Sequence, residues 1–251
     1  MDKNGNRIAI GLDVSTQTIG ICVLLEDGSE NGKIIELTHV SPKASKKMDG
    51  IEQLFVKKRV FGKFIEKYKD LGVDDVIIEE PLLRSNNINT CGTLLRFNGM
   101  ISDCIYDTLG VVPKYISSYD ARKYSFPELM SVRKYGKDGN IYPNDKIRKE
   151  IRQARLVLFG GYDWTVDKKS ILQDKVSQLF PEIQWIYDKD GELKKENFDA
   201  SDSYVACLGY LNKTKYGEMV FKVSNIKESK GKIDYDLEYW DRKEHRQTRL
   251  N

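Results

Sequence analysis

Five acidic residues stand where carboxylates could converge on a shared cation. Asp13 lies in an apolar run, Glu79 and Glu80 end another, and Asp199 and Asp202 lie three residues apart near the start of a predicted helix. An ionised carboxylate among apolar neighbours is costly unless a partner compensates its charge. The spacing of Asp199 and Asp202 puts both on one helix face. Such a cluster suits Mg²⁺ or Mn²⁺, which take carboxylate oxygens and keep bound waters.

Each acid also has an ordinary structural explanation. Asp13 can cap the turn that follows it, a charged pair is common at a strand end, and Asp199 and Asp202 favour the start of a helix through its dipole. Neighbouring residues of a strand point to opposite faces, so only one of Glu79 and Glu80 can face the site. The combination favours chemistry: two ions about 4 Å apart can activate water and stabilise the leaving oxygen of a phosphodiester.

The elements that must position these acids follow from the apolar periodicity. Arg7–Leu25 holds two apolar, β-rich runs around a polar turn, and Lys33–His39 continues them as a third antiparallel strand. Further on, the pattern predicts helices over 51–68, 93–109, 144–158, 170–180 and 198–211, and strands over 73–78 and 111–116. The order indicates an α/β domain whose mixed five-stranded sheet has three antiparallel strands, then parallel strands, flanked by helices.

The 251 residues suffice for a single domain with a substantial core. We assign residues 1–221 to that domain, including an extended basic segment over 126–167. Residues 222–251 form a charged C-terminal extension, expected to add an edge hairpin around Ile233–Trp240 and to be partly disordered.

The composition, with 40% hydrophobic and 31% charged residues and a net charge of +3, is typical of a soluble globular protein. We find neither a membrane-spanning apolar stretch nor a signal peptide, and therefore expect a cytoplasmic protein without a membrane partner. Four scattered cysteines lack the spacing of a zinc site or disulfide, so we expect reduced, buried side chains. They are Cys22, Cys91, Cys104 and Cys207.

Three motifs together resemble the RuvC-type Holliday-junction resolvases of the ribonuclease-H-like superfamily. IAIGLDVSTQTIGICVL resembles their first hairpin, VIIEEP their fourth strand, and FDASDSYVACLGYL their last helix. The resemblance implies that two Mg²⁺ ions, replaceable by Mn²⁺, are held by the catalytic acids Asp13, Glu79, Asp199 and Asp202. It also places Lys175, within DKVSQLF, at a basic position that helps to hold the scissile phosphate.

The resemblance implies a ribonuclease-H-like fold and a structure-selective endodeoxyribonuclease that resolves Holliday junctions or related branched DNA in recombination or repair. Water would attack the phosphodiester and leave 5′-phosphate and 3′-hydroxyl ends. Because a four-way junction has two-fold symmetry, paired cuts call for a homodimer. The loop after Glu79 has Leu82 and Leu83 instead of an aromatic wedge, and segment 126–167 exceeds the family minimum. Phage-encoded members carry such extensions, so the expected setting is a prokaryotic or phage-infected cell.

Two groups of residues are candidates for DNA contact. One follows the catalytic Glu79, in a stretch that resembles the junction-contacting loop and helix of the family, and the other is a run of basic residues with interleaved tyrosines. An ordinary solvated helix face is the alternative for the basic run, since Asp145 and Glu150 lie within it. The candidates are Arg84, Asn86, Asn87, Arg148, Lys149, Arg152, Arg155, Lys168 and Lys169.

Three other functions remain open at this stage. A ribonuclease H or another DNase of the same fold would share the acids. An actin-like or sugar-kinase-type ATP-binding protein also begins with a hairpin of this kind, but it needs a second phosphate loop and a Gly-rich adenosine motif, which we do not find. A non-catalytic DNA-binding protein would not need all four acids.

Overall fold

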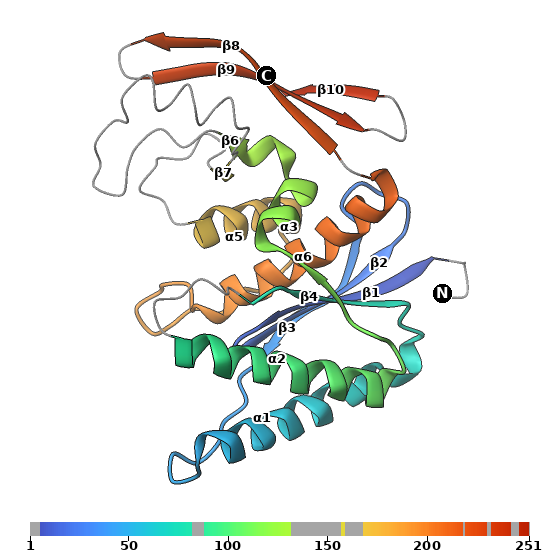
Figure 1. The fold of residues 1–251 in the computed structure, drawn as a ribbon, viewed down its shortest axis with the longest axis vertical. Helices are drawn as coiled ribbons and strands as arrows, with labels where there is room; N and C mark the ends of the chain where they lie inside the picture. The colour runs from blue at the N-terminus through green and yellow to red at the C-terminus, as the bar shows by residue number, and fades with distance from the viewer. Residues whose placement is uncertain are drawn as a thin grey trace.

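The central element is a mixed five-stranded sheet of order β3-β2-β1-β4-β5 (Figure 1). It comprises β1 (Arg7–Val14), β2 (Ile19–Glu26), β3 (Lys33–Val40), β4 (Asp75–Glu79) and β5 (Lys114–Ile116). The first three strands pair antiparallel, whereas β4 and β5 add parallel to β1. This arrangement confirms the predicted fold class.

The computed structural model describes residues 6–81, 88–131, 157–158, 168–217, 219–229, 232–241 and 246–250. One face of the sheet is covered by α1 (Gly50–Ile65), which continues into the 3-10 helix η1 (Glu66–Leu71), and by α2 (Ile88–Leu109). The other face is covered by α6 (Glu196–Tyr216). Two further helices, α3 (Ser118–Ser125) and α5 (Lys168–Leu179), pack on α6 (Figure 1).

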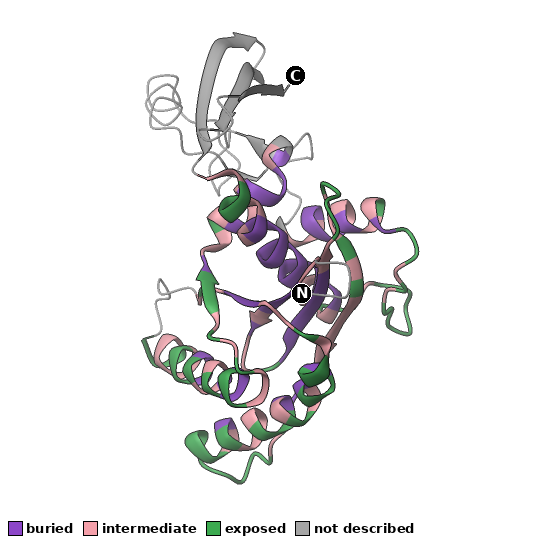
Figure 2. Cartoon of the chain, turned by 90° about the vertical axis from the view of Figure 1, so that its right-hand side faces the viewer, coloured by how far each residue is buried: buried purple, intermediate pink, exposed green. Residues whose placement is uncertain are grey.

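The alternation of β1 divides its side chains between the two faces. Ile8, Ile10 and Leu12 join the core beneath α1 and α2, whereas Ala9 joins the core beneath α6. Asp13 shares the parity of Ala9 and therefore belongs to the α6 face. Figure 2 shows that the α6 side of the sheet is the more deeply buried one: α6 is buried along most of its length, while α1 and α2 expose their outer sides.

Helix α6 can lie close to the sheet because two facing strand positions are glycines. A Cβ atom on Gly11 would lie 2.1 Å from the Ser203 carbonyl oxygen, and one on Gly20 would lie 1.9 Å from the Asp199 carbonyl oxygen. No side chain fits at such distances. The glycines therefore set the separation between the sheet and the first turns of α6.

The central part of the chain differs from the sequence prediction. Helix α2 begins five residues before the predicted position 93, and α3 was not predicted. The α3 sequence has few apolar residues, so its signal is the Ser117 cap, whose hydroxyl accepts from the Asp120 amide at 3.1 Å. The helix expected over 144–158 falls largely outside the described residues. Its predicted end is wrong: Val157–Leu158 is strand β7, paired with β6 (Met130–Ser131), which follows the 3-10 helix η2 (Pro127–Leu129).

The C-terminal part forms a separate antiparallel sheet of order β10-β9-β8. Its strands are β8 (Met219–Ser229), β9 (Lys232–Asp241) and β10 (Arg246–Leu250). The expected edge hairpin around Ile233–Trp240 is wrong, because this stretch is the middle strand, paired on both sides. The alternation of charged with apolar residues here has a strand's period of two, which accounts for the pairing.

Candidate active site

Two acids are aligned by the pairing of β1 with β4. The parallel register places Leu12 opposite Ile78, so the next residues, Asp13 and Glu79, are neighbours where both strands end. Both have the parity of the α6 face. Glu79 is partly buried, whereas Glu80 is exposed. The strand alternation thus directs Glu79 toward the same region as Asp13.

The other two acids come from the first turns of α6. Gly20 is the β2 partner of Asp13, and the backbone of Asp199 packs directly against it. Asp202 follows one turn later and is 2% exposed. The close contact between helix and sheet therefore brings Asp199 and Asp202 to the strand end that carries Asp13.

One ammonium group joins three of these carboxylates. Lys169 Nζ, from the start of α5, lies 2.9 Å from Asp199 Oδ1, 2.9 Å from Asp202 Oδ2 and 3.5 Å from Asp13 Oδ2. Within the described residues, no ion pair is formed by Glu79. Four acids and one lysine leave an excess of negative charge where β1, β4 and α6 meet.

Burial and mutual repulsion disfavour the ionised acids. Burial, reinforced by the negative charge of Asp202, raises the pKa of Asp13 from 3.8 to about 7, although Lys169 opposes the shift. Burial and the charges of Asp202 and Asp13 raise the pKa of Glu79 well above its ordinary value. Burial also raises the pKa of Asp202 despite the ion pair with Lys169. A further cation at this site would relieve the repulsion.

A second cation, Arg122 of α3, faces the same acids. Its positive charge partly offsets the raised pKa values of Glu79 and Asp202. Its Nε atom is buried and makes no hydrogen bond within the described part of the chain. Sequence reasoning missed Arg122; the signal that could have found it is a helix cap at Ser117, directly after β5, which places α3 beside the ends of the parallel strands.

The donor set is chemically suited to hard divalent cations. Its oxygens come from four carboxylates, and a positive group, the Lys169 ammonium, is already accommodated among three of them. Within the described residues, however, no three acidic, histidine or cysteine side chains are already arranged as a metal-ligand set. The oxygens gather around the lysine nitrogen, so a metal ion among them would compete with the Lys169 ammonium.

The structure separates the predicted basic residues. Lys169, predicted as a DNA contact, lies among the acids. Lys175, predicted as the basic residue that helps to hold the scissile phosphate, lies six residues along α5 with its ammonium 5.8 Å from the centre of the Phe126 ring. The side chain of Lys168 is outside the described part. So are the other predicted DNA contacts: Arg84, Asn86, Asn87, Arg148, Lys149, Arg152 and Arg155.

The turn after Asp13 is closed by the side chain of one of its residues, Ser15. The Ser15 hydroxyl accepts from the amides of Gln17 and Thr18 at 3.2 and 3.0 Å, and donates to the Thr18 carbonyl at 2.8 Å. The amides of Gln17 and Thr18 are therefore not available to bind a phosphate. The turn is built as a strand connection rather than as a phosphate loop.

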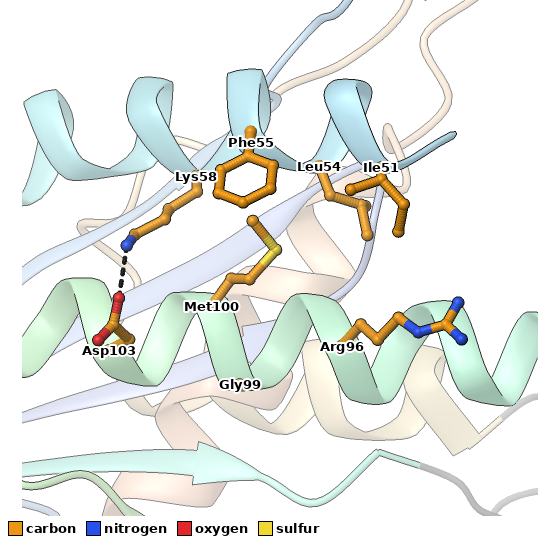
Figure 3. Close-up of a pocket in the computed structure, with 8 residues that line it drawn as sticks. All are labelled: Ile51, Leu54, Phe55, Lys58, Arg96, Gly99, Met100 and Asp103. Carbon is orange, nitrogen blue, oxygen red and sulfur yellow. Dashed lines mark hydrogen bonds and ion pairs between the residues drawn. The ribbon is translucent and has the colours of Figure 1, made fainter. Parts of the chain in front are cut away.

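A groove between α1 and α2 is distinct from the acid site. It has a volume of about 470 Å³, and Figure 3 shows Phe55 and Met100 facing each other across it, with the ion pair of Lys58 and Asp103 at one end. It lies on the face of the sheet opposite α6. Its lining holds no cluster of acids, so it offers no comparable chemistry.

Two broader expectations can be compared with the described residues. All four cysteines are unpaired; Cys22, Cys104 and Cys207 are buried as expected, whereas Cys91 is partly exposed. Over the described ranges, none of the helices combines the length and apolarity needed to cross a bilayer.

No protein-family model and no curated protein matches the chain. Solved structures align along most of it at low identity. Thermus thermophilus RuvC, alone and in complex with a Holliday junction substrate, aligns with 84% of this chain and 96% of its own, at 14% and 8% identity and TM-scores of 0.48 and 0.46.

The yeast mitochondrial Holliday junction resolvase Ydc2 aligns with 81% of this chain and 77% of its own, at 9% identity and a TM-score of 0.44. A putative sugar kinase from Cytophaga hutchinsonii aligns less well, with a TM-score of 0.32 at 14% identity over 68% of this chain and 71% of its own. Because the TM-scores of these structures are all below 0.5, any functional proposal depends on this chain's own sheet topology and carboxylates.

Proposed function

We propose that the protein is a metal-dependent endonuclease that cuts four-way or related branched DNA. The observation that carries the proposal is the convergence of Asp13, Glu79, Asp199 and Asp202, from three different elements, at one edge of the sheet. A structural explanation accounts for each acid alone, but not for four buried or partly buried carboxylates of which three share one ion-pair partner, Lys169, and the fourth, Glu79, has none among the described residues.

In this proposal the four acids hold two Mg²⁺ ions. Bound there, the ions supply an activated water and stabilise the leaving oxygen of the phosphodiester. Lys169, once displaced from the acids, would be available to pair with the scissile phosphate. Arg122 adds a planar, permanently charged donor group on the α3 side, suited to a phosphate oxygen. Both cations would orient the DNA strand and compensate its charge.

The proposed partner is branched DNA, bound by a homodimer. Two active sites related by a two-fold axis match two strands that are cut symmetrically. The basic run that includes Arg148, Lys149, Arg152 and Arg155 would neutralise phosphates beyond the cleavage site. Arg84, Asn86 and Asn87, between Glu79 and α2, remain proposed contacts near the branch point.

The test is cleavage of a panel of four-way, three-way, flap, linear and RNA–DNA hybrid substrates, with Mg²⁺, with Mn²⁺ and with chelator. We expect Mg²⁺-dependent cuts in the four-way substrate that leave 5′-phosphate ends. Asp13→Asn should reduce cleavage by at least about 10³-fold, because a neutral amide is a poor metal ligand, and should leave binding intact. Glu80→Gln, on the exposed neighbour of Glu79, is the matched control and should cut normally.

The panel also distinguishes the alternatives. Preferential cutting of the hybrid would favour a ribonuclease H. Unimpaired cutting by Asp13→Asn would refute the assignment of the acids. The ATP-binding alternative gains no support from the turn after Asp13, whose amides are bonded to Ser15.

A further inference from the structure

A smaller cavity lies where β4 ends, on the side of the sheet that α2 covers. Its volume is about 310 Å³, at the lower end of the range of about 300–1,000 Å³ that is usual for ligand sites. Ile78 belongs to the core beneath α1 and α2, so Glu80, two residues further along, has the parity of this side, opposite to that of Glu79. The cavity is lined by Glu80, Pro81, Leu95, Asn98, Gly99 and Tyr115.

One buried side chain of the lining has an unused acceptor. Asn98 is 2% exposed, and its Nδ2 donates to the Leu94 carbonyl at 2.9 Å, which identifies the other terminal atom of the amide as the oxygen. This Oδ1 atom is buried and has no hydrogen-bond partner within the described part of the chain. A buried acceptor without a donor is costly, so Oδ1 indicates a donor group that the protein itself does not supply.

The hydroxyl of Tyr115 can also only accept. The Ser102 hydroxyl donates its one hydrogen to the Asn98 backbone carbonyl at 2.9 Å, because a carbonyl cannot donate. The 2.6 Å hydrogen bond between the Ser102 and Tyr115 hydroxyls must therefore use the Tyr115 hydrogen. The Tyr115 oxygen keeps a lone pair for a ligand but no hydrogen to donate.

The polar side chains of the cavity together call for a ligand that is rich in donors. Glu80 adds an exposed carboxylate to the Asn98 and Tyr115 oxygens, so the lining combines acceptors with a negative charge. A phosphate or a carboxylate would be repelled. A guanidinium group has five N–H donors, a positive charge and no acceptor, and its flat face can pack on apolar surface such as that of Pro81 and Leu95.

We propose that this cavity binds a guanidinium group, with Glu80 pairing with its charge and the side-chain oxygens of Asn98 and Tyr115 accepting from its N–H groups. Two sources carry this chemistry: a free small molecule and an arginine side chain within a polypeptide. The inference goes beyond the proposed endonuclease function, because the site lies on the other side of the sheet from the catalytic acids and needs neither metal nor DNA.

The first experiment measures binding to the full chain by saturation-transfer difference NMR. The probes are agmatine, N-acetyl-arginine N-methylamide and the neutral N-acetyl-citrulline N-methylamide. We expect both guanidinium probes to bind with dissociation constants on the order of 1 mM, as suits so few atoms. The citrulline probe should bind at least tenfold more weakly, because it lacks the charge. Tighter binding of agmatine would identify a free small molecule as the ligand, and tighter binding of the blocked arginine a polypeptide side chain.

Two variants test the assigned acceptors. Asn98→Leu removes the buried oxygen and nearly keeps the size of the side chain, whereas Glu80→Gln removes an exposed charge. Each should weaken the binding of the blocked arginine at least fivefold. Asp107→Asn removes the same charge from an exposed position of α2 outside the cavity, and should change the dissociation constant less than twofold. Circular dichroism establishes folding, and Glu80→Gln alone decides if Asn98→Leu does not fold.

Three results would overturn the guanidinium site. The first is equal binding of the citrulline and arginine probes, and the second is unchanged binding in either folded variant. The third is no saturation transfer to any probe, which would mean that a water molecule supplies the donor to Asn98 Oδ1. None of these results bears on DNA cleavage, which depends on the acids on the other side of the sheet.

Discussion

At the scale of single residues, the site depends on which lysine meets the acids. The motif comparison indicated Lys175, whereas the ion pairs place Lys169 among Asp13, Asp199 and Asp202. Six residues along a helix turn the side chain by about 240°, so the two lysines leave α5 in different directions. Sequence alone does not fix the rotation of α5 about its axis, and the choice between them required the three-dimensional contacts.

Substitution separates the two lysines. Lys169→Ala should lower cleavage by about 10²-fold, because the phosphate loses a neighbouring cation. Lys175→Ala is the matched control on the same helix and should cut within about threefold of the wild type. Single-turnover rates at saturating Mg²⁺ provide the measurement. If Lys175→Ala lost more cleavage activity than Lys169→Ala, Lys175 would be the basic residue of the site.

The raised pKa of Asp13 gives the metal-free protein a characteristic pH dependence. The folded state takes up the proton more readily than the unfolded chain, so the contribution of Asp13 to stability is fully present below about pH 4. It is lost as the pH rises toward about 7, where the buried group ionises. In chelator at pH 8, Asp13→Asn should be more stable than the wild type by on the order of 1–3 kcal/mol.

Urea unfolding at pH 4 and pH 8 measures this difference. The gain should vanish at pH 4, where the wild-type carboxyl is protonated, and should shrink at pH 8 when Mg²⁺ is added. If the difference in the free energy of unfolding between Asp13→Asn and the wild type is the same at pH 4 and at pH 8, the pKa of Asp13 is not raised.

At the scale of elements, the position of α6 decides whether the acids meet. Strand pairing and helix periodicity were predictable for β1, β4 and α6, because their apolar patterns are strong. The close contact through Gly11 and Gly20 was not, since a glycine inside a strand has several explanations and only the packed structure shows what lies against it. Helix α3, which brings Arg122, was missed because a short helix with few apolar residues has little periodicity.

Gly20→Ala tests the contact between α6 and the sheet. The added methyl group would overlap the backbone of Asp199, so α6 must shift away from β2. We expect a loss of at least about 2 kcal/mol in the free energy of unfolding. We also expect cleavage to fall by more than tenfold in the fraction that remains folded.

A glycine without such a neighbour provides the control. Gly99 is exposed in α2, and nothing lies within 4 Å of a Cβ atom placed there. Gly99→Ala should therefore stabilise the protein by about 0.5–1 kcal/mol through helix propensity and leave cleavage unchanged. Similar effects of the two substitutions would mean that Gly20 acts only through strand propensity.

At the scale of the whole molecule, the net charge of +3 is too small to explain DNA binding by itself. Binding would depend on how the basic residues are distributed, and most of the predicted DNA contacts lie outside the described part of the chain. The sequence could predict the sheet and the acids, whose patterns are local. It could not predict the arrangement of cations around the acids, which depends on helices from distant parts of the chain.

Salt and stoichiometry test the binding proposal together. If six or more phosphates are neutralised, affinity for a four-way junction should fall on the order of 10³-fold between 50 and 200 mM salt. Sedimentation velocity in chelator should show two protomers per junction. One protomer per junction, or affinity that is insensitive to salt, would contradict the proposed homodimer or the proposed phosphate contacts, respectively.

The lysine within the acid cluster also bears on how the protein persists when divalent ions are scarce. An ammonium on a flexible four-carbon stem acts as a tethered counter-ion that dialysis cannot remove. Protein stripped of metal should therefore store well and regain activity on simple addition of salts. The same tether makes the lysine a competitor for every incoming ion, so occupancy would follow the free magnesium concentration instead of remaining permanently saturated.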